Sequence, residues 1–289
     1  MRFFRTFFRR GNMNSLDPFD YKEPKCLLCE GEDFYYPDRD KPQGSIPIRS
    51  IIAKLDSVFA KNDLDQAASI LSYWLKEAKE LKDKRGELEI RSEQIGLYRK
   101  LGDKEKGIES VEEGLRLLKE LSLSDTVSGA TVALNAATTY KAFGFAEKAI
   151  PIYEEVEKVY EKNLSPTDPL FAGLYNNEAL SFADVGRVDD AEKAYKKAIS
   201  ILDGVAGKQN DIAVSYVNLA HLCDDTEGKE DEAYGYIEKA IEYLDSPDLP
   251  HDGYHAFVLS KCLPSIEYFG YFIAKNKLEK RMNEIYERN

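Results

Sequence analysis

The chain has 289 residues, of which 43% are hydrophobic and 32% are charged, and its formal net charge is −12 at pH 7. This charged fraction exceeds the usual share of about 25% and favours long solvated helices over a compact sheet. A domain that binds nucleic acid normally presents a basic face to the phosphates, so the acidic balance argues against nucleic acid as the main partner. Three histidines and four cysteines offer few groups for metal or nucleophilic chemistry. We therefore expect a protein without a cofactor.

The first twelve residues, MRFFRTFFRRGN, are basic and rich in phenylalanine but hold no continuous apolar stretch. They do not resemble a secretory signal, and we interpret them as a tail or as an upstream start that precedes the true one at Met13. Contact with a membrane surface is the alternative. The most apolar window, 256–274, is interrupted by Lys261, Pro264 and Glu267 and is no candidate for a bilayer-spanning helix. Stable membrane insertion is therefore not expected.

Residues 13–47 contain five of the eleven prolines and show no helical period. Proline lacks the backbone donor and restricts its predecessor, so residues 1–47 are predicted to be irregular. This segment contains Cys26 and Cys29, which are half of a zinc knuckle. Plain reduced thiols in a cytoplasmic protein are the favoured interpretation, and a metal-linked dimer or a redox motif are the alternatives. The segment is expected either to cap the first helical hairpin or to compete with ligand for its binding site.

From residue 48 the chain carries an internal repeat. Glycines stand 42 residues apart at Gly102, Gly144, Gly186 and Gly228. Five residues after each glycine comes a small residue, namely Gly107, Ala149, Ala191 and Ala233. Glycine past a helix end supplies the left-handed conformation that closes the helix, and a small residue inside the next helix lets two helices approach closely. The pattern predicts an all-α fold built from antiparallel helix pairs.

The clearest repeat unit, LYNNEALSFADVGRVDDAEKAYKKAISIL at 174–202, resembles the tetratricopeptide repeat family. The preceding unit matches it through Ala137, Tyr140, Gly144 and Ala149. Pro151 and the long period are similar to the repeats of kinesin light chains. The resemblance implies a right-handed superhelical solenoid in which the first helix of each pair lines a concave groove.

Six pairs are predicted, near 48–83, 85–122, 127–162, 168–203, 208–245 and 253–287. The outer units match less well, because Asn62 takes the place of the turn glycine in the first unit. In the last unit Lys275 replaces the small residue, and Pro264 is expected to interrupt the first helix. Terminal repeats with more polar residues are typical of the capping units at the ends of a repeat array. Tyrosines and phenylalanines at repeat positions are expected in the core.

Three asparagines, Asn135, Asn177 and Asn218, recur two positions before the small alanine of successive first helices. An asparagine in mid-helix is not favoured by helix propensity. Its amide both donates and accepts, so it can pair with the main chain of an extended peptide. In peptide-binding members of the family an asparagine at this place does hold the ligand. The structural alternative is an asparagine that bonds between adjacent hairpins.

The same register places further side chains in the groove. The candidates for ligand contact are Arg99, Lys141, Thr138, Asp184, His221 and Lys261. The set is basic near one end and acidic near the other, which would orient a peptide. Arg99 and Lys141 resemble part of the carboxylate clamp of chaperone-binding members, but the full clamp is not assembled.

We therefore predict a non-enzymatic scaffold in the cytoplasm that binds a protein or peptide ligand. One alternative is a bacterial-type regulator that senses a peptide and acts through a partner. A metal-linked dimer through the paired cysteines is another. A hydrolase or phosphatase in the groove would have only Glu178 and His221 as candidate catalytic residues.

Overall fold

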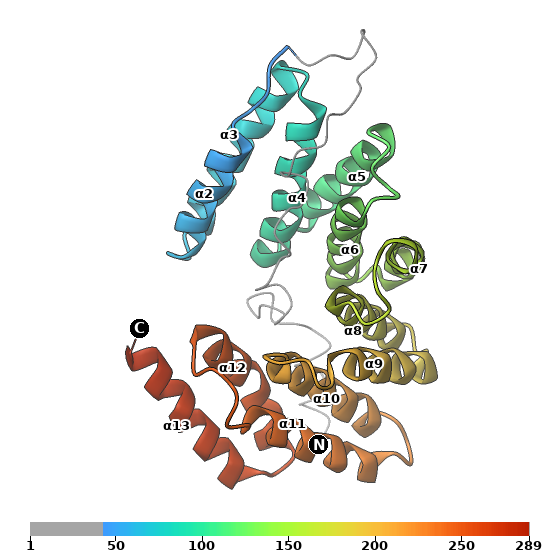
Figure 1. Ribbon diagram of the computed structural model, residues 1–289, viewed down its shortest axis with the longest axis vertical. Helices are drawn as coiled ribbons and strands as arrows, with labels where there is room; N and C mark the ends of the chain where they lie inside the picture. The colour runs from blue at the N-terminus through green and yellow to red at the C-terminus, as the bar shows by residue number, and fades with distance from the viewer. Residues whose placement is uncertain (1–42, 289) are drawn as a thin grey trace. The chain divides into compact units, whose positions relative to one another are not determined.

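The computed structural model describes residues 43–288, and these residues form helices joined by short turns (Figure 1). Cys26, Cys29 and most of the expected irregular segment lie outside the described residues. Residues 43–47 precede the first helix without regular structure. The described part divides into two compact units, 43–163 and 164–288.

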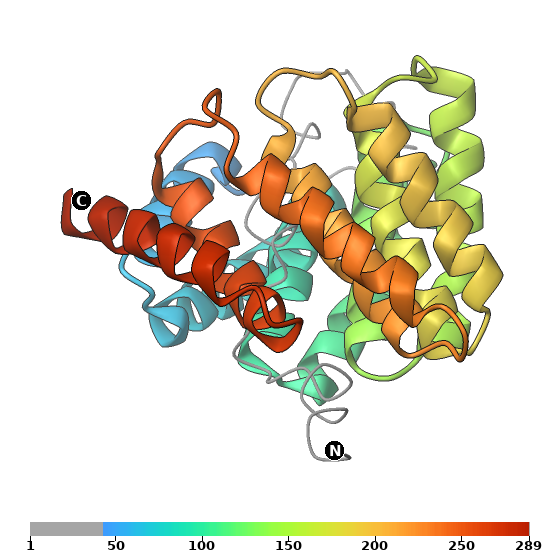
Figure 2. The ribbon, with the colours of Figure 1, turned by 90° about the horizontal axis from the view of Figure 1, so that it is seen from below.

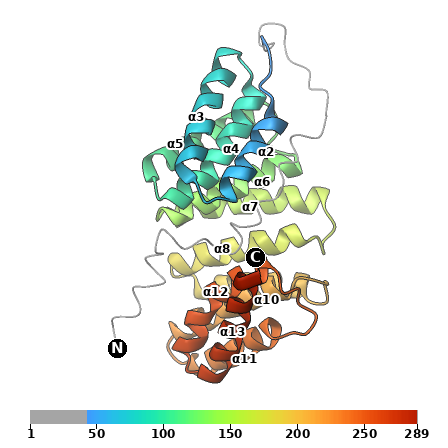
Figure 3. The ribbon, with the colours of Figure 1, turned by 90° about the vertical axis from the view of Figure 1, so that its left-hand side faces the viewer.

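The first unit consists of three helix pairs, drawn from blue to green in Figure 3. Its helices are α2 (Ile48–Phe59), α3 (Leu64–Glu80), α4 (Lys84–Leu101), α5 (Lys104–Glu120), α6 (Val127–Ala142) and α7 (Ala146–Asn163). Asp63, Asp83 and Asp103 cap the N-termini of α3, α4 and α5 by accepting hydrogen bonds from backbone N–H groups three residues ahead. Such a cap stabilises a helix by about 1 kcal/mol. α4 packs against α3, α5 and α6 and is the most buried helix of this unit.

The second unit also consists of three pairs, which run from yellow-green to red in Figure 2. Its helices are α8 (Pro169–Asp184), α9 (Val188–Leu202), α10 (Gln209–Asp224), α11 (Glu230–Leu244), α12 (Gly253–Tyr268) and α13 (Phe272–Arg288). Each helix packs most extensively against its partner in the same pair. The predicted fold class, an all-α array of helix pairs, is confirmed, whereas a single repeat domain over 48–287 stays a prediction.

The turn glycines adopt the conformation that their spacing predicts. Gly102, Gly144 and Gly186 have φ values of 68°, 85° and 78°. Asn62, which replaces glycine in the first unit, has φ 53°. This left-handed region is costly for side chains other than glycine and asparagine.

The small residues predicted for the second helices are buried where neighbouring helices approach. Ala149, Ala191 and Ala233 are each 0% exposed. A Cβ atom added at Gly107 would lie 2.6 Å from the Phe143 ring. The repeat tyrosines Tyr153 and Tyr195 are buried around these contacts, as the sequence predicts.

One expectation about the last pair is wrong, because Pro264 does not interrupt its first helix. α12 continues through this residue to Tyr268. A proline inside a helix removes one backbone hydrogen bond and costs about 3 kcal/mol. Cys262, Leu263 and Ile266 around it are buried, and burial of one large apolar side chain contributes about 1.5–3 kcal/mol. Packing of this face therefore outweighs the lost bond.

Candidate binding surfaces

In the first unit, Arg99 joins the first helices of two neighbouring pairs. Its guanidinium projects from α4 and donates to the Thr139 hydroxyl at 2.9 Å and to the Asn135 carbonyl at 3.3 Å, both on α6. Arg99 is only 8% exposed. Its contacts fix the spacing of α4 and α6, and a clamp role toward a ligand stays a prediction.

The remaining candidates of this unit lie on α6. The Asn135 side chain is half-buried, and it makes no hydrogen bond with the residues that the structure describes. Thr138 is buried and donates to the Leu134 carbonyl at 2.9 Å while it accepts from the Tyr153 hydroxyl at 3.3 Å. Lys141 is half-buried in the last turn of α6. Asn135 and Lys141 thus have accessible polar atoms, whereas the Thr138 hydroxyl is engaged within its own helix pair.

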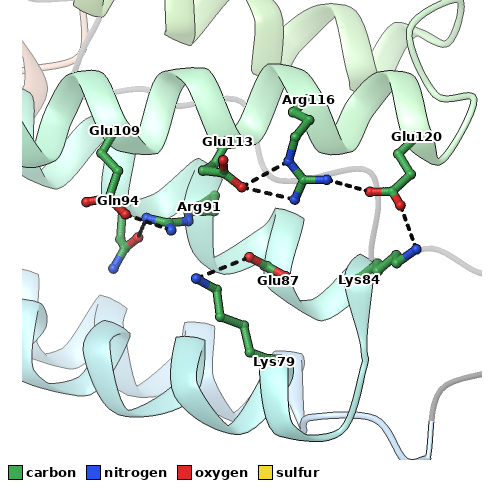
Figure 4. Close-up of polar contacts among 9 residues, drawn as sticks. All are labelled: Lys79, Lys84, Glu87, Arg91, Gln94, Glu109, Glu113, Arg116 and Glu120. Carbon is green, nitrogen blue, oxygen red and sulfur yellow. Dashed lines mark hydrogen bonds and ion pairs between the residues drawn. The ribbon is translucent and has the colours of Figure 1, made fainter.

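Charged side chains form a network where α4 meets α3 and α5 (Figure 4). The buried Arg91 guanidinium on α4 donates to Glu109 of α5 at 3.0 Å and to Gln94 at 3.2 Å. Lys84 pairs with Glu120 at 2.6 Å, and this contact lowers the pKa of that carboxyl. Because every charge drawn pairs with another, the network stabilises the helix pair and leaves little charge for a ligand.

In the second unit, α8 carries Asn177 and Asp184. The Asn177 amide is 6% exposed and donates to the Gly173 carbonyl one turn earlier at 2.9 Å. Asp184 is exposed at the end of the helix. Gly173 and Leu180 are half-buried on the same side, and this side is the more accessible face of α8.

α10 carries Asn218 and His221 one turn apart. The Asn218 side chain is half-buried and, like Asn135, has no hydrogen bond with a described residue. His221 Nε2 lies 2.9 Å from the Ser265 hydroxyl on α12. Desolvation lowers the pKa of His221, although Asp224 and Asp225 nearby oppose this shift. A neutral imidazole fixed to Ser265 suits a structural role better than catalysis.

α12 carries Lys261, the last of the groove candidates. Its ammonium nitrogen lies 5.4 Å from the centroid of the Phe257 ring one turn earlier. The side chain is half-buried. Together, Asn218, His221 and Lys261 lie on the first helices α10 and α12, which pack against each other.

Bonds between adjacent hairpins are made by asparagines other than the three predicted ones. Asn176 on α8 accepts from the Ser215 hydroxyl of α10 at 2.9 Å. Asn210 on α10 lies 2.8 Å from Nδ1 of His255 on α12. Sequence reasoning missed both contacts because these residues do not recur at the repeat interval. Asparagines therefore do bond between adjacent hairpins, as the structural alternative states, but these are Asn176, next to Asn177, and Asn210, at the start of α10.

The described residues offer little for metal or thiol chemistry. Among residues 43–288, no group of three potential metal ligands is found. Cys223 and Cys262 are buried, and burial raises the pKa of their thiols to about 11 and about 12. Glu178 is 6% exposed on α8. None of the described helices combines the length and the apolar character that crossing a bilayer requires.

The comparisons with known proteins agree with the repeat architecture. Residues 172–201 match the tetratricopeptide repeat family. A crystal structure of BtubC (BKLC) from P. vanneervenii is similar with a TM-score of 0.60 and 22% identity, over 68% of this chain and 79% of that chain. A putative kinesin light chain with nearly identical TPR-like repeats from Podosopora anserina has a TM-score of 0.52 and 16% identity, over 70% and 95% of the two chains.

A third similar structure is MamA, residues 41 to the end, from Desulfovibrio magneticus RS-1. Its TM-score is 0.52 and its identity 14%, over 71% of this chain and 99% of that chain. At such identities the likeness extends to the fold alone. No curated protein matches the chain.

Proposed function

We infer from its tetratricopeptide repeats that this chain is a scaffold for protein–protein interaction, and that it binds an extended segment of a partner along its first helices. Each unit offers such a face, on α4 and α6 in the first and on α8, α10 and α12 in the second. The chain acts in this proposal without catalysis, and a cytoplasmic location stays a prediction.

One observation carries the proposal. The side chains of Asn135 and Asn218 are partly accessible and bond to no described residue, whereas Asn176 and Asn210 each bond to a side chain of the next hairpin. A mid-helix asparagine without an internal partner gains nothing for the helix. It can donate to and accept from the backbone of a bound segment.

Asn177 contributes more weakly to this proposal. One N–H of its amide already donates to Gly173, and the residue is only 6% exposed, so less of its amide is offered to a partner. We therefore expect Asn135 and Asn218 to contribute more to affinity than Asn177.

Affinity capture from a lysate of the source cells tests the proposal. The wild type is compared with Asn135→Ala/Asn177→Ala/Asn218→Ala, after circular dichroism has shown that both are folded. A matched variant, Asn163→Ala/Asn276→Ala/Asn283→Ala, removes three exposed asparagines that lie on second helices. Partners retained by the wild type and the matched variant, but lost from the first variant, support the proposal. Identical capture by all three proteins would show that the asparagines hold no ligand.

A further inference from the structure

Aromatic side chains gather at the ends of α10 and α12 in the second unit. The Phe269 ring lies 5.0 Å from Tyr268, 5.8 Å from Tyr234 and 5.4 Å from His221 between ring centroids. Phe269 is 7% exposed, but Tyr268 and Tyr234 are 50% and 49% exposed. The cluster therefore has a buried centre and an accessible rim.

The first residues of α13, which follow the turn at Gly270, are also large exposed apolar residues. Phe272 is 59% exposed and Ile273 is 88% exposed. We call Tyr234, Tyr268, Phe272 and Ile273 the aromatic patch. Exposed large apolar side chains that gather in one part of a domain mark interaction sites, since water contact with them is unfavourable.

Carboxylates stand beside the aromatic patch. Asp224 accepts a hydrogen bond from the Tyr268 hydroxyl at 2.9 Å, and Asp225 and Glu227 follow it in the turn after α10. Glu267 is exposed in the last turn of α12. We call these four residues the acidic rim. Within the described residues, Asp225, Glu227 and Glu267 take part in no ion pair.

Lys229 and Lys275, which follow the rim residues in sequence, form their ion pairs with carboxylates outside the acidic rim, and Glu267 adds a weaker electrostatic contact to Lys275. Lys229 pairs with Glu192, and Lys275 pairs with Glu279 at 2.8 Å. Lys261 lies almost two turns before the end of α12.

We propose that the aromatic patch and the acidic rim dock a partner segment in which arginines alternate with aromatic or large aliphatic residues. This inference rests on the proposed scaffold function and specifies where in the second unit a partner binds and by which chemistry. An arginine guanidinium stacks on a tyrosine face and pairs with a carboxylate through two parallel hydrogen bonds. The alternate side chains of the segment cover Phe272 and Ile273.

Other partner chemistries fit this surface poorly. An acidic segment is repelled by the carboxylates of the rim. A wholly apolar segment would take those carboxylates out of water without a counter-charge, which is costly. Charge complementarity thus selects a basic and apolar segment.

The test measures binding of a fluorescein-labelled peptide, in which arginine alternates with tyrosine, to the full chain by fluorescence anisotropy. The control peptide carries neutral citrulline in place of every arginine. Asp225→Asn/Glu227→Gln/Glu267→Gln removes three of the four rim charges and keeps Asp224, which bonds Tyr268. Glu147→Gln/Glu154→Gln/Glu161→Gln changes the net charge equally, using exposed carboxylates of α7 in the first unit.

The rim variant is expected to bind the arginine peptide about tenfold more weakly, since three partly exposed ion pairs together contribute about 1.4 kcal/mol. Phe272→Ser/Ile273→Ser is expected to weaken it similarly, and the α7 variant by less than about twofold. Equal loss in both charge variants, or equal affinity for the citrulline peptide, would overturn the proposal. If the peptide does not bind but Asn135→Ala/Asn177→Ala/Asn218→Ala still loses captured partners, the scaffold function stands and this docking chemistry is wrong.

Discussion

His255 makes the stability of the second unit depend on pH. Its imidazole is 0% exposed at the start of α12, and Nδ1 lies 2.8 Å from Asn210 Oδ1. Burial lowers its pKa from 6.5 to about 4, and the nearby Arg281 and His251 act in the same direction while Asp252 opposes them. The positive end of the α12 helix dipole also disfavours a charged imidazole there.

The direction in which the free energy of unfolding changes with pH follows from proton uptake at His255. Between pH 6.5 and pH 4 the unfolded chain binds a proton at this histidine and the folded chain does not, so the free energy of unfolding falls as the pH falls. Each unit of pKa difference corresponds to about 1.4 kcal/mol. The full effect is therefore about 3 kcal/mol, of which about 2 kcal/mol is lost between pH 7 and pH 5. Above pH 6.5, where His255 is neutral in both the folded and the unfolded chain, none of this free energy of unfolding is lost.

Urea unfolding followed by circular dichroism at pH 7, 6 and 5 measures this effect. His255→Gln keeps a donor for Asn210 but cannot be protonated, so its free energy of unfolding is expected to fall less toward pH 5 than that of the wild type. His251→Gln removes an exposed histidine and is expected to keep nearly the wild-type dependence. The same pH dependence in His255→Gln and wild type would refute the reasoning.

Three further predictions concern packing and reactivity. Gly173→Ala is expected to raise the free energy of unfolding by up to about 1 kcal/mol, since an added Cβ meets no atom within 4 Å. Gly129→Ala places a Cβ 2.0 Å from a backbone oxygen and is expected to lower the free energy of unfolding by about 1–3 kcal/mol. Urea midpoints that shift in the same direction for both variants would contradict this. Asn176→Ala is expected to cost about 1–3 kcal/mol because it removes two buried hydrogen bonds of the amide, with Ser215 and with the Ala172 carbonyl, against less than about 0.5 kcal/mol for Asn218→Ala. An equal loss of stability would assign Asn218 a structural role. Cys262 is expected to resist iodoacetamide in the native protein at pH 8 and to react after unfolding, as mass spectrometry of the alkylated peptides would show; rapid native alkylation would contradict its burial.

Much of the fold could be predicted from the sequence because its strongest signals are local. A left-handed turn at Gly102 or Gly144 depends on a few backbone angles, and only glycine or asparagine adopts them cheaply. A buried alanine such as Ala191 recurs at Ala149 and Ala233 because these three pairs bring helices close together at the same position. Pro264 was misjudged because the packing that offsets its lost hydrogen bond involves residues on other helices.

The candidate surface was less predictable for two physical reasons. Repeat register predicts which face of a helix holds Asn177, but the bond of its neighbour Asn176 to Ser215 depends on how two helices cross. Tyr268 stands two residues before Gly270, which is the register of Asp184 before Gly186 and not that of the core aromatics Tyr140 and Phe182. It is half exposed, and its contact with Phe269 depends on packing within the last pair rather than on the repeat interval.

The side-chain bonds between α10 and α12 have a mechanical consequence. Near the start of both helices Asn210 bonds His255 and Asp211 bonds Tyr254, and near their ends Asp224 bonds Tyr268. Because α10 and α12 are bonded near both ends, neither helix can slide or rotate past the other without breaking a hydrogen bond. The last two hairpins therefore respond to load as one stiff segment.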